Sequence, residues 1–175
     1  MLGQITRCFH YRDKVVFLRL YKQYVRTHLE FSSSVWSPWQ QADVQILENV
    51  QKKAIGMISG LRSSVYEERL VELDLWTLEK RREMFDMIQV YKMANKIGNV
   101  QSSLVFNRDL NNSNRTTRNR SEPLNLVKQR SNLEIKRHFF SDRVVDKWNS
   151  IPSAIKNARD VKNFKNCIVK LMNEN

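Results

Sequence analysis

Residues 77–98 carry the strongest pattern in this chain, and the pattern is that of a helix. Apolar side chains recur at the three- and four-residue spacing of one helical face, namely Met84, Met87, Ile88, Tyr91 and Ala94. Thr77 is placed to cap the first free amide groups, and Gly98 is placed to take the left-handed turn that ends a helix. We therefore expect a core helix over this range, with the other segments packed around it.

Similar spacing and capping signals predict five further helices, so the expected fold class is all-α. The chain has only 4 Gly and 3 Pro in 175 residues, which argues against a turn-rich β fold. Ser37 and Ser64 each open a predicted capping box, and Asp160 is a predicted cap. The six helices are expected at residues 13–29, 38–59, 64–73, 77–97, 136–149 and 160–172.

The same periodicity predicts which side chains face the core. In the first helix these are Phe17, Leu20, Tyr21, Tyr24 and His28, with His28 interpreted as a hydrogen-bonded core histidine. In the second helix they are Ile46, Leu47, Val50, Ala54, Met57 and Ile58. Gln51, Lys52 and Lys53 are expected largely on the outer side of that helix.

Charge is distributed unevenly along the chain. The formal net charge is +12, and residues from 101 onward hold fifteen basic and seven acidic side chains. We expect a helical bundle over residues 1–100, a polar basic linker over 101–135, and a helical extension over 136–175 that packs on the bundle. Leu124, Leu126, Leu133 and Ile135 leave one short β-hairpin in the linker as an alternative to irregular chain. A surplus of this size favours binding to polyanions, and nucleic acid first among them.

The sequence lacks the residue clusters that common catalytic and metal sites require. It contains no adjacent Asp pair, glycine-rich phosphate loop or serine-centred nucleophile motif. Cys8 and Cys167 are too few for a disulfide scaffold, which fits an intracellular location, cytoplasmic or nuclear. No apolar run approaches the roughly 18 residues of a membrane span. We therefore expect no catalysis by this chain alone, no metal, no cofactor and no membrane insertion.

Short motifs follow one another along nearly the whole chain. The N-terminal ones are Arg26-Thr27-His28-Leu29-Glu30-Phe31, Val35-Trp36-Ser37-Pro38, Leu47-Glu48-Asn49-Val50-Gln51-Lys52-Lys53-Ala54 and Gly60-Leu61. The later ones are Tyr66-Glu67-Glu68-Arg69-Leu70, Thr77-Leu78-Glu79, Arg81-Arg82, Tyr91-Lys92, Phe139-Phe140-Ser141, Arg143-Val144-Val145, Trp148-Asn149, Ile151-Pro152 and Phe164-Lys165. In order and spacing they resemble the C-terminal region, thumb and beyond, of the reverse transcriptase protein of LINE-type, non-LTR retrotransposons (jockey and chicken-repeat type).

This resemblance implies a thumb-like helical domain and a basic extension that follow the catalytic palm of an RNA-directed DNA polymerase. The metal-binding carboxylates of that palm lie upstream in the family and are absent here. Two departures, Thr27 and Trp76, stand where the family usually has proline. Because Met1 falls just before the first helix, the chain is expected to be an open reading frame left by a truncated transposable element.

Charge and resemblance together predict a non-catalytic fragment that holds RNA or an RNA/DNA template–primer duplex. Two alternatives stay open: a protein-interaction module that meets a palm domain or a second copy, and a remnant with no cellular role. For the arginine-rich residues 108–130, a solvated loop that only keeps the protein soluble is a further alternative. The expected phosphate contacts are Lys52, Lys53, Arg81, Arg82, Arg115, Arg118, Arg120, Arg130, Arg137 and Arg143.

Overall fold

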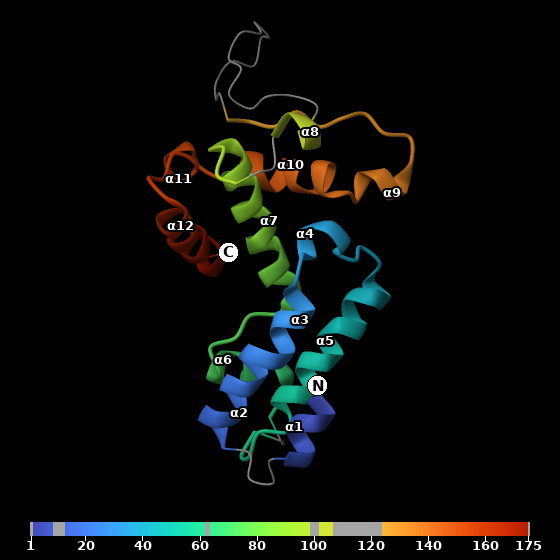
Figure 1. Ribbon diagram of the computed structural model, residues 1–175, viewed down its shortest axis with the longest axis vertical. Coiled ribbons are helices and arrows are strands. Elements are labelled where there is room, and N and C mark those ends of the chain that lie inside the picture. The colour runs from blue at the N-terminus through green and yellow to red at the C-terminus, as the bar shows by residue number, and fades with distance from the viewer. Residues whose placement is uncertain (1, 9–12, 62–63, 99–101, 107–123, 175) are drawn as a thin grey trace, which may run out of the picture. The chain divides into compact units, whose positions relative to one another are not determined.

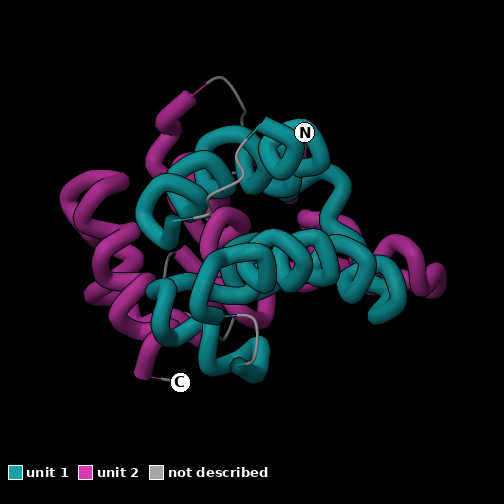
Figure 2. Tube along the Cα trace, turned by 90° about the horizontal axis from the view of Figure 1, so that it is seen from below, with its two compact units in different colours: residues 1–82 teal, residues 83–175 magenta. Residues whose placement is uncertain are grey.

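The structure confirms the all-α class. The computed structural model describes residues 2–8, 13–61, 64–98, 102–106 and 124–174, and these residues form helices and no strand (Figure 1). They divide into two compact units, Met1–Arg82 and Glu83–Asn175 (Figure 2). The division falls inside α7 (Leu78–Ala94), whereas the sequence suggested boundaries at residues 100 and 135. The alternative hairpin is not formed, because residues 124–133 are irregular.

The first unit is built from the predicted helices and two short ones that the periodicity did not indicate. The short ones are α1 (Leu2–Cys8) and α4 (Ser33–Trp36). The first predicted helix is continuous but consists of α2 (Lys14–Leu20), the π-helical turn η1 (Tyr21–Val25) and α3 (Arg26–Glu30). The remaining helices are α5 (Gln41–Ile55), α6 (Tyr66–Glu72) and the start of α7.

The π-helical turn changes which face of the first helix is buried. The backbone amide of Arg26 donates to the carbonyl of Tyr21, which is the five-residue step of a π-helix. Buried positions therefore follow one another every four residues, at Phe17, Tyr21 and Val25. The predicted inward position of Tyr24 is wrong, since this residue is 51% exposed. The prediction for His28 is also wrong, because it lies on the exposed side as well.

The start of the second predicted helix is wrong by three residues. The backbone amide of Ser37 donates to the carbonyl of Ser33, so Ser37 is the C-cap of α4, and α5 begins only at Gln41. Gln40 stands before α5 with extended backbone and no side-chain cap. The helix then ends at Ile55, and turns carry the chain to Gly60, whose φ is 87°.

Two of the three remaining N-terminal capping predictions are confirmed. The hydroxyl of Thr77 accepts a hydrogen bond from the amide of Lys80 at 3.2 Å, and Asp160 accepts one from the amide of Asn163 at 2.7 Å. The box predicted at Ser64 is displaced by one residue, because the carboxylate of Glu68 accepts from the amide of Val65. α6 therefore begins at Tyr66.

The left-handed residue that ends α7 is Lys96 and not the predicted Gly98. Lys96 adopts the left-handed conformation with φ of 55°, and the amide of Ile97 donates to the carbonyl of Lys92 at 2.8 Å. This six-to-one hydrogen bond is the Schellman closure of a helix. Gly98 also has a positive φ, of 104°, but it follows Lys96 by two residues and does not form this hydrogen bond.

The core of the first unit lies between α2, α5 and α6. Leu2 and Ile5 of α1 pack against its edge. Burying apolar surface of this kind is the main favourable term in folding such a bundle. The buried residues are Phe17, Ile55, Ile58, Leu61, Leu70, Leu73 and Leu75, with Tyr21, Val25 and Ala54 in a second cluster beside them.

In the residues that the structure describes, the second unit contains the rest of α7 and five further helices. These are α8 (Ser102–Phe106), α9 (Glu134–Arg137), α10 (Phe140–Ser150), α11 (Ser153–Lys156) and α12 (Val161–Glu174). The helix predicted over 136–149 is thus two helices, because Phe139 is extended with ψ of 153°. The predicted stop at Ile151 and Pro152 is confirmed, since α10 ends at Ser150.

An aromatic stack forms the core of the second unit. The rings of Tyr91 and Phe164 stack with centroids 4.3 Å apart, and the ring of Trp148 lies 5.9 Å from that of Phe164. The two polar rings donate hydrogen bonds to backbone carbonyl groups, the hydroxyl of Tyr91 to Ala158 and the indole nitrogen of Trp148 to Leu124. The stack therefore joins α7, α10 and α12 without leaving a buried donor unpaired.

Candidate nucleic-acid interface

Gln51 does not face solvent, and this overturns the prediction for its side of α5. It is fully buried, at 0% exposed. Its amide oxygen accepts a hydrogen bond from the hydroxyl of Tyr21 at 2.6 Å. Its amide nitrogen donates to the hydroxyl of Tyr66 and to the carbonyl of Trp76, each at 3.0 Å. The residue therefore links four segments of the first unit from a position that the sequence pattern assigned to solvent.

Glu48, about one turn earlier on α5, belongs to the same buried network. Its carboxylate accepts hydrogen bonds from the hydroxyl of Tyr66 and from the backbone amide of Leu78, the latter at 2.9 Å. Leu78 is the first residue of α7, so the carboxylate caps the positive end of that helix. Burial raises the pKa of the Tyr21 phenol. Burial, and then the hydrogen bond to Glu48, raise the pKa of Tyr66.

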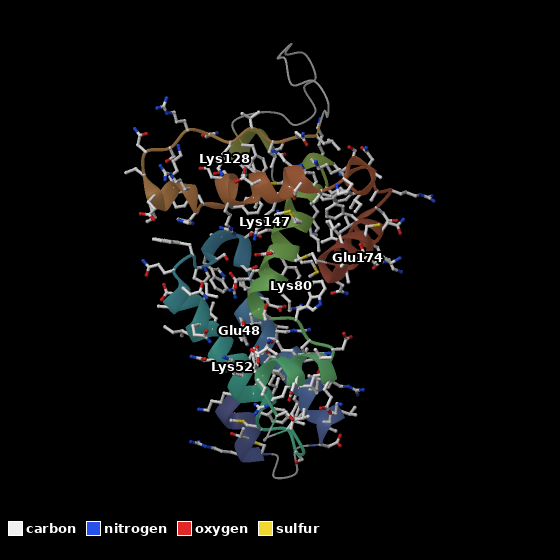
Figure 3. All side chains as sticks on the ribbon, turned by 180° about the vertical axis from the view of Figure 1, so that it is seen from behind. Glu48, Lys52, Lys80, Lys128, Lys147 and Glu174 are labelled. Atoms are coloured by element: carbon white, nitrogen blue, oxygen red, sulfur yellow. The ribbon has the colours of Figure 1, made fainter. Side chains whose placement is uncertain are left out.

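Lys52 and Lys53 are adjacent in sequence but differ in surroundings. The ammonium group of Lys52 lies over the ring of Tyr66, 4.9 Å from its centroid, and the side chain is half-buried. Lys53 is exposed. Figure 3 shows Lys52 beside Glu48 on the same helix. Lys52 thus contributes a cation–π contact to the rim of the buried network, while Lys53 is open to solvent.

Arg81 and Arg82, both predicted phosphate contacts, take part in the packing of the first unit. The guanidinium of Arg81 makes two hydrogen bonds to the carboxylate of Glu30, one of them 3.0 Å long. Arg26 lies 3.6 Å from the same carboxylate. Burial, and then the charge of Arg81, lower the pKa of Arg26. Arg82 is 3% exposed, so neither Arg81 nor Arg82 presents a free guanidinium group on the surface.

Arg143 performs a similar packing role in the second unit. Its Nε and Nη2 atoms donate to the two carboxylate oxygens of Asp86 at 2.9 and 3.1 Å. Its guanidinium also lies 5.6 Å from the ring centroid of Phe140. Because Asp86 is buried, this two-point ion pair holds α10 against α7.

Arg130 and Arg137, in contrast, are exposed. The Nε and Nη2 atoms of Arg137 donate to the carbonyl of Ser131, each at 3.3 Å. The hydroxyl of Ser131 in turn exchanges hydrogen bonds with the backbone of Leu133. Lys136, which was not among the predicted phosphate contacts, precedes Arg137 in sequence and is partly exposed. Within the described ranges, no ion pair joins these three cations to a carboxylate. We call Arg130, Lys136 and Arg137 the α9 surface.

A second group of exposed cations lies on α12 and was also missed. Lys162, Lys165 and Lys170 are exposed, while Phe164 and Ile168 of the same helix are buried. The signal was present in the sequence, because these lysines lie outside the apolar stripe of a helix that the sequence did predict. No acidic partner for them occurs among the residues that the structure describes.

Three predicted contacts, Arg115, Arg118 and Arg120, lie outside the described residues, and their role stays a prediction. Two other lysines, both labelled in Figure 3, carry ion pairs instead: Lys128 with Asp146 of α10, and Lys147 of α10 with Glu83. In the described part of the chain, no three His, Cys, Asp or Glu side chains gather where they could hold a metal ion.

Comparison with known proteins identifies no relative. No protein-family model, no curated protein and no solved structure matches this chain. The resemblance to retrotransposon reverse transcriptases therefore rests on the short sequence motifs. None of the helices in the described ranges is long and apolar enough to cross a lipid bilayer.

Proposed function

We propose that this chain binds nucleic acid through the second unit, with the α9 surface as the main contact. The observation that carries the proposal is that the cations of the α9 surface are accessible and have no carboxylate partner in the described ranges. Arg130 and Arg137 are exposed and Lys136 is partly exposed, and none is neutralised by a carboxylate within the described ranges. When exposed, unpaired cations meet phosphates, they displace the counterions condensed on the nucleic acid. This counterion release is the dominant sequence-independent term in nucleic-acid binding.

The ion pairs of two other predicted contacts, Arg81 and Arg143, support this choice of surface. Arg81 and Arg143 already make two-point contacts with buried or half-buried carboxylates. Moving Arg143 to a phosphate would take its two-point partner from the buried carboxylate of Asp86, which costs several kcal/mol. Moving Arg81 would break its two hydrogen bonds to Glu30 and leave that carboxylate with Arg26. The cations of the α9 surface can contact a phosphate without breaking an ion pair of the described residues. The lysines of α12 would add to the attraction of a long polyanion as a secondary surface.

The resemblance to reverse transcriptases favours RNA or an RNA/DNA duplex as the ligand and a palm domain as a second partner. We propose further that the chain is not itself a polymerase. Purified chain is expected to show no primer extension with either Mg²⁺ or Mn²⁺. Metal-dependent extension that persists through stringent purification would contradict this.

The salt dependence of binding tests the main proposal. Replacing Arg130, Lys136 and Arg137 together with Ala removes up to three phosphate contacts. The log–log salt slope should then become shallower by about 0.9 per lost contact on duplex and about 0.7 on single strands. The measurement is fluorescence anisotropy across a salt series, with circular dichroism to confirm folding.

A control variant removes the same charge elsewhere. Arg7, Arg19 and Lys22 lie in the first unit, at exposed or partly exposed positions. Replacing all three with Ala should change the slope much less. Equal effects of the two triple variants would show that only net charge matters, and absence of binding by the unaltered chain would end the proposal.

An apolar surface on the first unit favours protein interaction as a second candidate function. Phe31 and Val35 are 76% and 85% exposed, and Trp36 and Trp39 lie beside them in sequence with about two fifths of their area exposed. Such a patch marks interaction sites in many proteins. Sedimentation velocity should then show self-association that changes little with salt and is lost in Val35→Glu. A monomer at all concentrations would remove self-association from this candidate.

A further inference from the structure

Two adjacent phenylalanines in the second unit differ in environment, because Phe140 is half-buried and Phe139 is exposed. The ring of Phe140 lies 6.1 Å from that of Phe106, and the guanidinium of Arg143 covers it. Phe139, its neighbour, is 57% exposed. A ring that is 57% exposed gains only part of the free energy of burial in its own fold, and several exposed apolar side chains in one segment mark interaction sites in many proteins.

The backbone beneath Phe139 is held in place. Its carbonyl oxygen accepts hydrogen bonds from the amides of Asp142 and Arg143, both at 3.0 Å, because it stands at the start of α10. The ring is thus carried on a fixed point of the scaffold. An aromatic side chain with only two rotatable bonds then loses little conformational freedom on contact with a ligand.

Cations and apolar side chains surround this ring in sequence. Arg137 and Lys136 precede it by two and three residues, and Arg130 lies on the adjoining irregular segment. Val127, Leu133 and Ile135 are each about three fifths exposed. The segment therefore combines, close together in sequence, cations that have no carboxylate partner in the described ranges, exposed apolar side chains, and an aromatic ring on a held backbone.

We propose that this segment binds single-stranded nucleic acid, with one base stacked on the ring of Phe139 and the adjacent phosphates neutralised by the α9 surface. In a duplex both faces of every internal base are covered by neighbouring bases, so the ring would meet only sugar and phosphate. A single strand offers the free π-face of a base, for which aromatic side chains next to cations are the usual receptors. This inference rests on the proposed function and specifies its ligand.

The test compares single-stranded with duplex RNA of equal length. The probes are a fluorescein-labelled oligouridylate and a blunt RNA duplex, titrated with the full chain. Phe139→Ala should weaken binding to oligouridylate about fivefold or more and leave duplex binding nearly unchanged. The salt slope should stay as in the unaltered chain, because no charge is removed. Phe139→Trp should retain or strengthen binding, and Phe139→Leu should lose it in spite of similar apolar area.

The matched control is Tyr24→Ala, which removes an aromatic ring of similar exposure from the first unit. It should leave both affinities unchanged, and thermal unfolding should confirm that each variant is folded.

Unchanged oligouridylate affinity in Phe139→Ala, or equal losses on both RNAs, would overturn the stacking inference. If the α9 surface still set the salt slope in that case, the proposed function would stand without it. Loss of binding to phosphatidylserine vesicles in Phe139→Ala, with RNA binding intact, would assign the segment to an anionic lipid surface instead and would also overturn the inference.

Discussion

The two units fill their best-buried positions with different chemistry. In the first unit the centre includes a fully buried glutamine, Gln51, hydrogen-bonded to side chains and backbone from three other segments. In the second unit the centre is aromatic, with Phe164 and Trp148 in contact, and a buried polar side chain, Lys156, lies over the ring of Trp148. Aromatic packing depends on volume, whereas a polar network depends on every donor finding its acceptor. The two units should therefore respond to different substitutions and to different solvent conditions.

The largest effect on the free energy of unfolding should come from removing a ring of the aromatic stack. Phe164→Ala removes the ring that lies between Tyr91 and Trp148, and it should lower the free energy of unfolding by about 3–5 kcal/mol. Urea unfolding followed by tryptophan fluorescence measures this change. The exposed Phe31→Ala serves as the control and should cost little. A loss below about 1 kcal/mol in Phe164→Ala would mean that the site collapses and that the stack is not the core of this unit.

Breaking the ion pair of Arg143 should come next. Arg143→Ala leaves the carboxylate of Asp86, 6% exposed, without its two-point partner, and we expect a loss of about 3 kcal/mol. Lys147→Ala on the same helix removes an exposed pair with Glu83 and should cost under about 0.5 kcal/mol. Similar losses in the two variants, measured by thermal unfolding, would show that burial does not set the strength of these pairs.

Gln51→Leu tests the polar centre of the first unit at nearly constant volume. The hydroxyl of Tyr21 and the carbonyl of Trp76 would lose their buried partner, at a cost of about 1–3 kcal/mol. Gln45→Leu is the matched control, because Gln45 is exposed on the same helix. A leucine variant at Gln51 that is as stable as the unaltered protein in urea would contradict a stabilising role for the network.

Alkaline pH should weaken the first unit through the same network, with the smallest effect of the four. The pKa of Tyr21 is raised above its ordinary value of 10.0 by burial, so the unfolded chain loses this proton first as pH rises. The free energy of unfolding should therefore fall above about pH 10, by at most about 1.4 kcal/mol per pH unit for this residue. Below that pH its contribution is fully present.

Urea unfolding at about pH 9 and pH 11 would detect this fall. Tyr21→Phe should reduce it, while Tyr24→Phe should not, since Tyr24 is half exposed. Lysine deprotonation acts on all three proteins alike. Equal falls in the unaltered chain and in Tyr21→Phe would remove Tyr21 as the cause.

The predicted helices were found because their signals are local. Thr77 and Asp160 cap helices through amides three residues ahead, and such a contact needs nothing from the rest of the chain. The failures at Ser37 and Tyr24 have a different origin. Ser37 is recruited to close α4, and the π-helical turn at Tyr21 displaces the buried face, and neither event leaves a periodic trace in the sequence.

The candidate site divides in the same way. Arg130 and Arg137 are exposed cations, as the polar composition around them suggested, and the lysines of α12 follow from its apolar stripe. Arg81 and Arg143 looked equivalent to them in sequence. Their carboxylate partners, Glu30 and Asp86, are 51 and 57 residues away along the chain. A charge pattern shows where cations occur and gives no indication of which ones a distant acid will neutralise.

The sequence by itself determined the helical class, most helix positions and the surplus of positive charge, since propensity, capping and net charge depend on neighbouring residues or on composition alone. Tertiary structure decided that Gln51 and Glu48 are buried, that Arg81 and Arg143 are paired, and that Phe139 is exposed beside a half-buried Phe140. The physical reason is that burial and ion pairing depend on which groups come together from distant segments. The same side chain is stable inside when its partners converge on it and outside when they do not.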